Sequence, residues 1–68
     1  MSVTVLFLWS EDGISVVSVL IDGVDATYTT SYEEVEKDLV ALGLTVSQDA
    51  SLFYTSAAGM YFQQVWSA

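Results

Sequence analysis

The stretch SYEEVEKDLVALGL, residues 31–44, carries helix signals at both of its ends and along one side. Ser31 and Glu34 form a capping-box pattern. In this pattern the Ser hydroxyl accepts a hydrogen bond from a backbone N–H of the first turn, and the Glu side chain accepts one from the backbone N–H of the Ser. Gly43 predicts the stop, and Leu44 then closes onto the helix in a Schellman contact. The apolar residues at helical spacing are Tyr32, Val35, Leu39 and Leu42. The sequence therefore predicts one helix here.

Three runs before this helix are rich in β-branched and aromatic residues. Residues 3–9 and 14–21 predict two strands, and residues 24–29 predict a shorter, more polar third strand. The Asp22-Gly23 dipeptide between the second and third runs is a strong hairpin signal. We expect the three runs to form neighbouring antiparallel strands.

The residues after the helix predict further strands. Residues 44–47 predict a strand that breaks at 48–50, and residues 52–55 and 60–66 predict a hairpin that turns near residues 57–59. The element order is therefore β-β-β-α-β-β within a single α+β domain over residues 1–68. We expect a small antiparallel β-sheet with one α-helix packed across one face.

Both faces of the first two predicted strands are apolar. A helix of about eleven residues is only about 16 Å long, so it covers one face of such a sheet. The second face then needs other cover, and we expect a homodimer in which two sheets pack together. A sheet curled into a barrel and bulged strands that all serve one core are the alternatives. The predicted oligomer interface is Leu6, Leu8, Val17, Val19 and Ile21.

The charge of the chain is strongly negative. Nine acidic residues face a single basic residue, Lys37, and the formal net charge is −8. Such a chain repels the phosphates of nucleic acids and of anionic membranes and attracts basic proteins. The predicted partner-binding acidic surface is Glu33, Glu34, Glu36, Asp38, Asp22 and Asp25. The alternative is a solvated face that only keeps an apolar protein in solution.

Catalytic residue types are scarce. The chain has no His and no Cys, so its serines lack a base to activate them. No metal-ligand or nucleotide motif is present, and we expect neither a catalytic role nor a cofactor or metal. An enzyme working through a carboxylate pair is a remote third hypothesis. No signal-peptide pattern and no membrane-spanning run appears, so we expect a cytoplasmic protein.

These features together favour a protein that works by binding another protein. The leading hypothesis is a stoichiometric inhibitor or modulator of a basic, nucleic-acid-binding protein, whose carboxylates imitate a phosphate array. In size and charge the chain is similar to phage-encoded inhibitors of host defence, anti-CRISPR proteins included, although no motif carries this resemblance. The alternative is a non-catalytic assembly module that forms an obligate homo-oligomer through its apolar sheet face.

Overall fold

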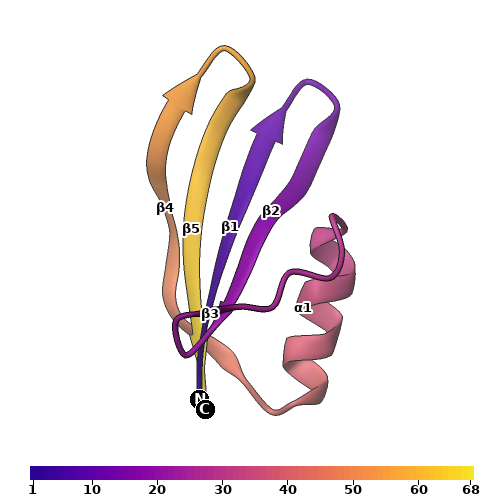
Figure 1. The fold of residues 1–68 in the computed structure, drawn as a ribbon, viewed down its shortest axis with the longest axis vertical. Coiled ribbons are helices and arrows are strands. Elements are labelled where there is room, and N and C mark those ends of the chain that lie inside the picture. The colour runs from indigo at the N-terminus through magenta and orange to yellow at the C-terminus, as the bar shows by residue number, and fades with distance from the viewer.

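A computed structural model describes residues 1–68 as one antiparallel sheet and one helix (Figure 1). The elements are β1 (Ser2–Ser10), β2 (Gly13–Ile21), β3 (Val24–Asp25), α1 (Tyr32–Ala41), β4 (Thr45–Ser56) and β5 (Gly59–Ser67). The strands lie in the order β3-β2-β1-β5-β4. The predicted fold class, a small antiparallel sheet with a helix across one face, is confirmed.

β1 lies at the centre and joins two hairpins. It pairs with β2 on one side and with β5 on the other, and β4 forms the far edge. Ser2 pairs with Ser67, so the two ends of the chain lie side by side at one end of the sheet (Figure 1). At the opposite end, both hairpins extend beyond the helix. The helix therefore covers only part of one sheet face.

A β-bulge at Val17 decides which residues of β2 enter the core. Phe7 pairs with Val16 and Leu6 pairs with Ser18, so Val17 has no partner on β1. The extra residue places Val16 and Val19 on the same face, although they are three positions apart. Val19 and Ile21 share the helix side of the sheet, whereas Val17, which unbroken alternation would place with them, lies in the bulge.

The core lies between the helix and the sheet. Ten of the 68 residues are buried, and all of them except Gln64 are apolar. The nine apolar core residues are Val3, Val5, Phe7, Val16, Val19, Val35, Leu39, Leu44 and Trp66. The bulge lets β1 and β2 both contribute to this single core, but Leu6 and Leu8 stay outside it, so the alternative in which bulged strands all serve one core is right about the bulge alone.

The ends of α1 follow the predicted signals with two differences. The Ser31 hydroxyl accepts a hydrogen bond from the Glu34 backbone N–H at 3.3 Å, but the Ser31 N–H donates to Thr29 Oγ1 instead of to Glu34. At the other end the backbone N–H of Leu44 donates to the Leu39 carbonyl at 3.1 Å, as a Schellman motif requires. The predicted core residue Leu42 is 62% exposed.

The two edge strands differ from their predicted lengths. β3 has two residues because the Asp25 carboxylate accepts the Thr27 N–H at 2.9 Å and turns the chain away from the ladder. β4 is longer than predicted and continues through residues 48–50, where its register with β5 shifts. Three such irregularities occur along β4. They make a poor template for edge-to-edge pairing with another strand.

Candidate protein-binding surfaces

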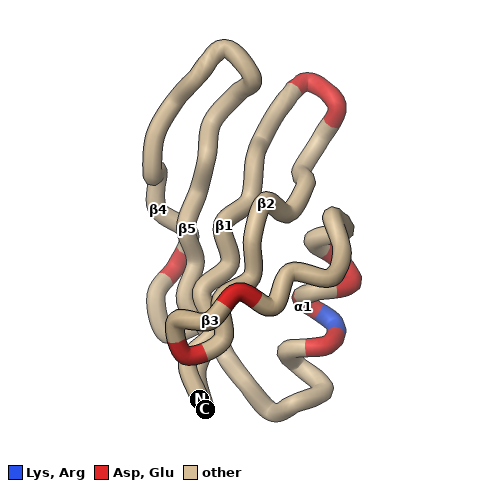
Figure 2. The backbone as a smooth tube through the Cα atoms, viewed as in Figure 1, with Lys and Arg blue, Asp and Glu red and all other residues tan.

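The carboxylates are concentrated on one part of the molecule. All nine acidic residues are exposed. Eight of them precede β4, on the β1–β2 turn, the β2–β3 region and α1, and only Asp49 lies in the β4–β5 hairpin. Figure 2 shows this separation, with red segments around β2, β3 and α1 and a single red segment on β4. The fold thus has an acidic side and a nearly uncharged side.

The six predicted acidic residues are not equally free. Asp38 accepts the Tyr28 hydroxyl at 2.6 Å, and Glu34 accepts the Thr29 hydroxyl at 3.1 Å, so both hold the segment that leads into the helix. Asp22 accepts the Ser2 N–H at 2.8 Å. Asp25 is also engaged, through Thr27.

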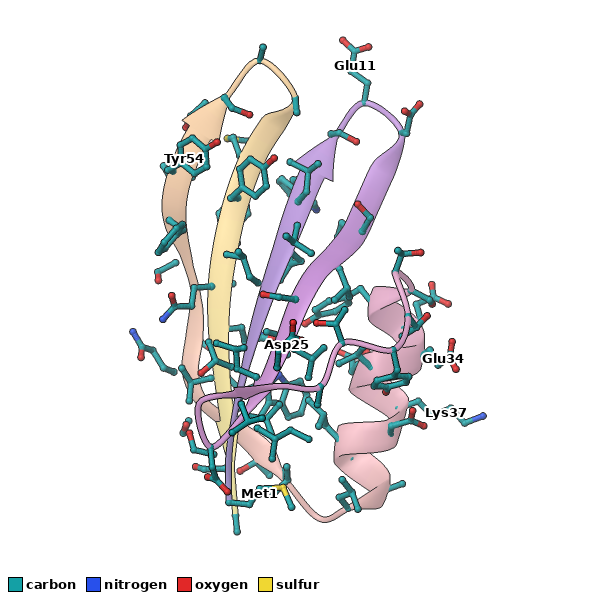
Figure 3. The ribbon with its side chains drawn as sticks, viewed as in Figure 1. Met1, Glu11, Asp25, Glu34, Lys37 and Tyr54 are labelled. Carbon is teal, nitrogen blue, oxygen red and sulfur yellow. The ribbon has the colours of Figure 1, made fainter.

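Glu33 and Glu36 make no side-chain hydrogen bond, so they are the two helix carboxylates available to a partner without breaking an internal contact. The lone cation, Lys37, points away from the sheet (Figure 3). It therefore lies on the outer surface of the helix, directly after Glu36 in sequence.

The hydrogen bonds of the acidic side shift two pKa values. The bond to Asp38 is the main reason why the pKa of Tyr28 rises to about 12. The hydrogen bond from the Thr27 side chain lowers the pKa of Asp25 below its usual value. The lowered pKa favours the charged form of Asp25, and the raised pKa favours the protonated, hydrogen-bond-donating form of Tyr28.

The sheet face opposite the helix has no cover within the chain. Alternation from the buried Val5 and Phe7 places Leu6 and Leu8 on this face. Register then adds their partners from β2, β4 and β5, and the Tyr54 and Tyr61 rings stack at 4.8 Å. The uncovered face comprises Thr4, Leu6, Leu8, Ser15, Ser18, Leu20, Asp25, Gln48, Ser51, Tyr54, Tyr61, Gln63 and Val65. Asp25, which pairs with Leu20, brings a carboxylate to the β3 edge of this face.

The predicted oligomer interface is divided by this arrangement. Leu6 and Leu8 lie on the uncovered face. Val19 is 2% exposed in the core beneath the helix, and Ile21 pairs with the buried Val3 and so belongs to the helix side. Val17 lies in the bulge and is 44% exposed.

The helix side of the sheet has an aromatic hollow where the hairpins extend beyond α1. The reach of a nine-residue strand is about 30 Å and that of a ten-residue helix about 15 Å. The hollow has a volume of about 330 Å³ and is lined by Phe7, Trp9, Ile14, Tyr32, Ala50, Phe62 and Gln64. The Phe62 ring lies 5.7 Å from the rings of both Phe7 and Trp9. The sequence did not predict this hollow. The strands were nevertheless predicted to be longer than the helix, and this difference in length indicates that part of the sheet face stays uncovered.

Gln64 is the one buried polar residue of the fold and borders this hollow. Its Oε1 accepts the Tyr32 hydroxyl at 2.7 Å and the Trp66 indole N–H at 2.9 Å. An indole N–H can only donate, so the atom that it meets must be the amide oxygen. The orientation of the amide group is therefore fixed, with its nitrogen on the other side.

Three further observations complete the description of these surfaces. No three His, Cys, Asp or Glu side chains gather as a metal site would require. The helix is too short to cross a bilayer. No protein-family model, curated protein or solved structure matches this chain.

Proposed function

We propose that this chain is a non-catalytic protein that binds the basic surface of a nucleic-acid-binding protein and inhibits or modulates it stoichiometrically. The observation that carries this proposal is the separation of charge, with eight exposed carboxylates on one side of the fold and a single lysine. A surface of this kind competes with nucleic acid for lysine and arginine side chains.

The internal contacts of the acidic side support this function. Tyr28 and Thr29 hold Asp38 and Glu34 in fixed positions, so little side-chain freedom is lost when a partner binds them. The hydrogen bond from the Thr27 side chain lowers the pKa of Asp25, which favours the charged form that a basic partner would meet.

The test measures binding of purified nucleic-acid-binding proteins to the immobilised chain at several salt concentrations, with lysozyme as a basic protein that has no nucleic-acid role. We expect saturable one-to-one binding of one class of these proteins, competition by its nucleic acid, and a Kd that rises about tenfold or more between about 50 mM and about 300 mM salt. Binding that is insensitive to salt, or equal for lysozyme, contradicts the proposal.

A charge-matched pair of variants sharpens the test. The double variant Glu33→Gln/Glu36→Gln removes two negative charges from the acidic side, and Asp49→Lys changes the net charge by the same amount on β4. We expect the first variant to weaken binding clearly more than the second. Equal losses would mean that only the net charge matters.

The uncovered face favours a second function, an assembly module that forms a homodimer. Two chains that each carry a net charge of −8 repel one another, but the centre of the uncovered face has no carboxylate to oppose a second copy, since Asp25 lies at its β3 edge. Leu6, Leu8 and Tyr61 would lie at the centre of such an interface. The bulges of β4 disfavour the other route, pairing through the sheet edge.

Sedimentation equilibrium tests this second function. We expect a dimer for the unmodified chain and a monomer for Leu8→Asp, with the same circular dichroism spectrum. Val40→Asp places the same charge on an exposed position of α1, away from the uncovered face, and serves as the control. A monomeric unmodified chain at millimolar concentration contradicts this function and leaves the first one standing.

A further inference from the structure

The aromatic hollow is the middle of a longer trough. A second hollow, of about 610 Å³, lies between the hairpin tips and shares Trp9 with it. A third, of about 390 Å³, lies at the start of the helix and shares Ile14 and Tyr32 with it. The three hollows therefore form one line from the hairpin tips to the helix N-terminus.

The middle of the trough is apolar and its two ends are acidic. Glu11 and Asp12 line the hollow between the hairpin tips, and Glu33 lines the hollow at the start of the helix. Glu11 projects from the tip of the β1–β2 hairpin (Figure 3). A ligand that fits this pattern is apolar in its middle and positively charged at both ends.

The middle of the trough also offers a hydrogen-bond donor. Gln64 is 9% exposed, and its oxygen is occupied by Tyr32 and Trp66. The Gln64 amide nitrogen makes no hydrogen bond within the chain. Every fully enclosed side-chain nitrogen and oxygen of the chain does make one, so this nitrogen must reach open space. The open space that Gln64 borders is the aromatic hollow. A buried amide N–H favours a ligand that brings an acceptor to it.

We propose that the trough binds an extended segment of a partner protein in which one tyrosine lies between basic residues. The tyrosine ring enters the aromatic hollow between Trp9 and Ile14, and its phenol oxygen accepts a hydrogen bond from the Gln64 amide. The flanking lysine or arginine side chains meet Glu11 and Asp12 at one end and Glu33 at the other. This inference rests on the proposed function, since it names the recognition element of the basic partner.

The test uses a blocked heptapeptide, Lys-Lys-Ser-Tyr-Ser-Lys-Lys, titrated into the ¹⁵N-labelled chain. We expect the side-chain amide resonances of Gln64 and the indole resonance of Trp9 to shift. Peptides with Phe or Ala in place of Tyr bind more weakly, Phe by about threefold to tenfold because one hydrogen bond is lost, and Ala by more. In Gln64→Leu the Tyr and Phe peptides bind equally.

A second pair of variants keeps the test independent of the folding of Gln64→Leu. Ile14 and Val24 are both exposed, at 44% and 69%, and only Ile14 lines the trough. We expect Ile14→Lys to reduce binding of the Tyr peptide at least tenfold and Val24→Lys, which adds the same charge, to leave it nearly unchanged.

The outcomes separate this inference from the proposed function. If the Ala peptide binds as tightly as the Tyr peptide and binding remains sensitive to salt, the trough inference is overturned and binding to basic proteins stands. If a peptide with Ser in place of every Lys binds as tightly as the original, both are overturned. Equal effects of Ile14→Lys and Val24→Lys also overturn the trough inference.

Discussion

The Tyr28 hydroxyl donates a 2.6 Å hydrogen bond to the Asp38 carboxylate, which ties the irregular segment after β3 to the second turn of α1. Thr29 makes the parallel contact with Glu34 one helical turn earlier. The acidic side thus contributes hydrogen bonds that stabilise the fold. The helix, which buries Val35 and Leu39 in the core, is held in place by this connecting segment as well.

Tyr28 is expected to titrate at unusually high pH for a tyrosine. Its pKa of about 12 lies above the ordinary value of 10.0, so the contact stabilises the fold fully below about pH 10 and loses this contribution as the pH rises towards 12. Spectrophotometric titration of the phenol groups checks this, with Tyr28→Phe to assign the step. In Asp38→Asn the titration step of Tyr28 should move to lower pH. An unchanged titration curve would contradict the presence of the Tyr28–Asp38 hydrogen bond.

Gly59→Ala should destabilise the protein more than Gly13→Ala. Both glycines have positive φ, +141° and +113°, but only at Gly59 would a Cβ overlap the Trp9 carbonyl oxygen. We expect a loss of about 1 kcal/mol at Gly13 from backbone strain and of about 3 kcal/mol at Gly59. Urea denaturation followed by tryptophan fluorescence measures both, and equal losses would show that the close approach to β1 is absent.

Val19→Ala should cost far more stability than Val17→Ala, although both residues belong to one β-branched run. Val19 is 2% exposed and Val17 is 44% exposed. Removing two buried methyl groups costs about 2 kcal/mol once the cavity is included, whereas the exposed bulge position should lose well under about 1 kcal/mol. The free energies of unfolding from urea denaturation decide this, and the reverse ranking would place the bulge elsewhere in β2.

Gln64→Leu should destabilise the fold by about 2 kcal/mol or more. The substitution leaves the Tyr32 hydroxyl and the Trp66 indole N–H without their acceptor. Gln63→Leu lies on the uncovered face and is the matched control, with little effect on stability. Thermal unfolding by circular dichroism compares the two variants. If Gln63→Leu is as unstable as Gln64→Leu, the hydrogen bonds to Gln64 Oε1 are not the cause of the lost stability.

The parts of the fold that sequence predicted well depend on local signals. Asp22 and Gly23 both have positive φ, 50° and 86°, as the Asp-Gly dipeptide of a tight hairpin requires. Gly43, also at positive φ, ends the helix one residue after its C-cap. These residues act within one turn of chain, so their effect is visible without the rest of the fold.

The features that sequence did not predict depend on contacts between distant strands. Nothing in the run Ser15–Ser18 distinguishes Val17 as the bulged residue, because the bulge exists only in its register with Leu6 and Phe7. The aromatic hollow likewise depends on tertiary structure, because it forms where the two hairpins extend beyond the end of the helix. The acidic residues were predicted to be exposed, and they are, but their hydrogen bonds to Tyr28, Thr29 and Thr27 required the path of the connecting segment.

The pairing of Ser2 with Ser67 has a mechanical consequence. A force applied between the two chain ends would load the β1–β5 ladder from one extremity and open its hydrogen bonds one after another, like a zip, instead of shearing them together. The sheet should therefore yield to low tension along this direction. Tension applied between the hairpin tips and the chain ends would act along the strands and meet much greater resistance.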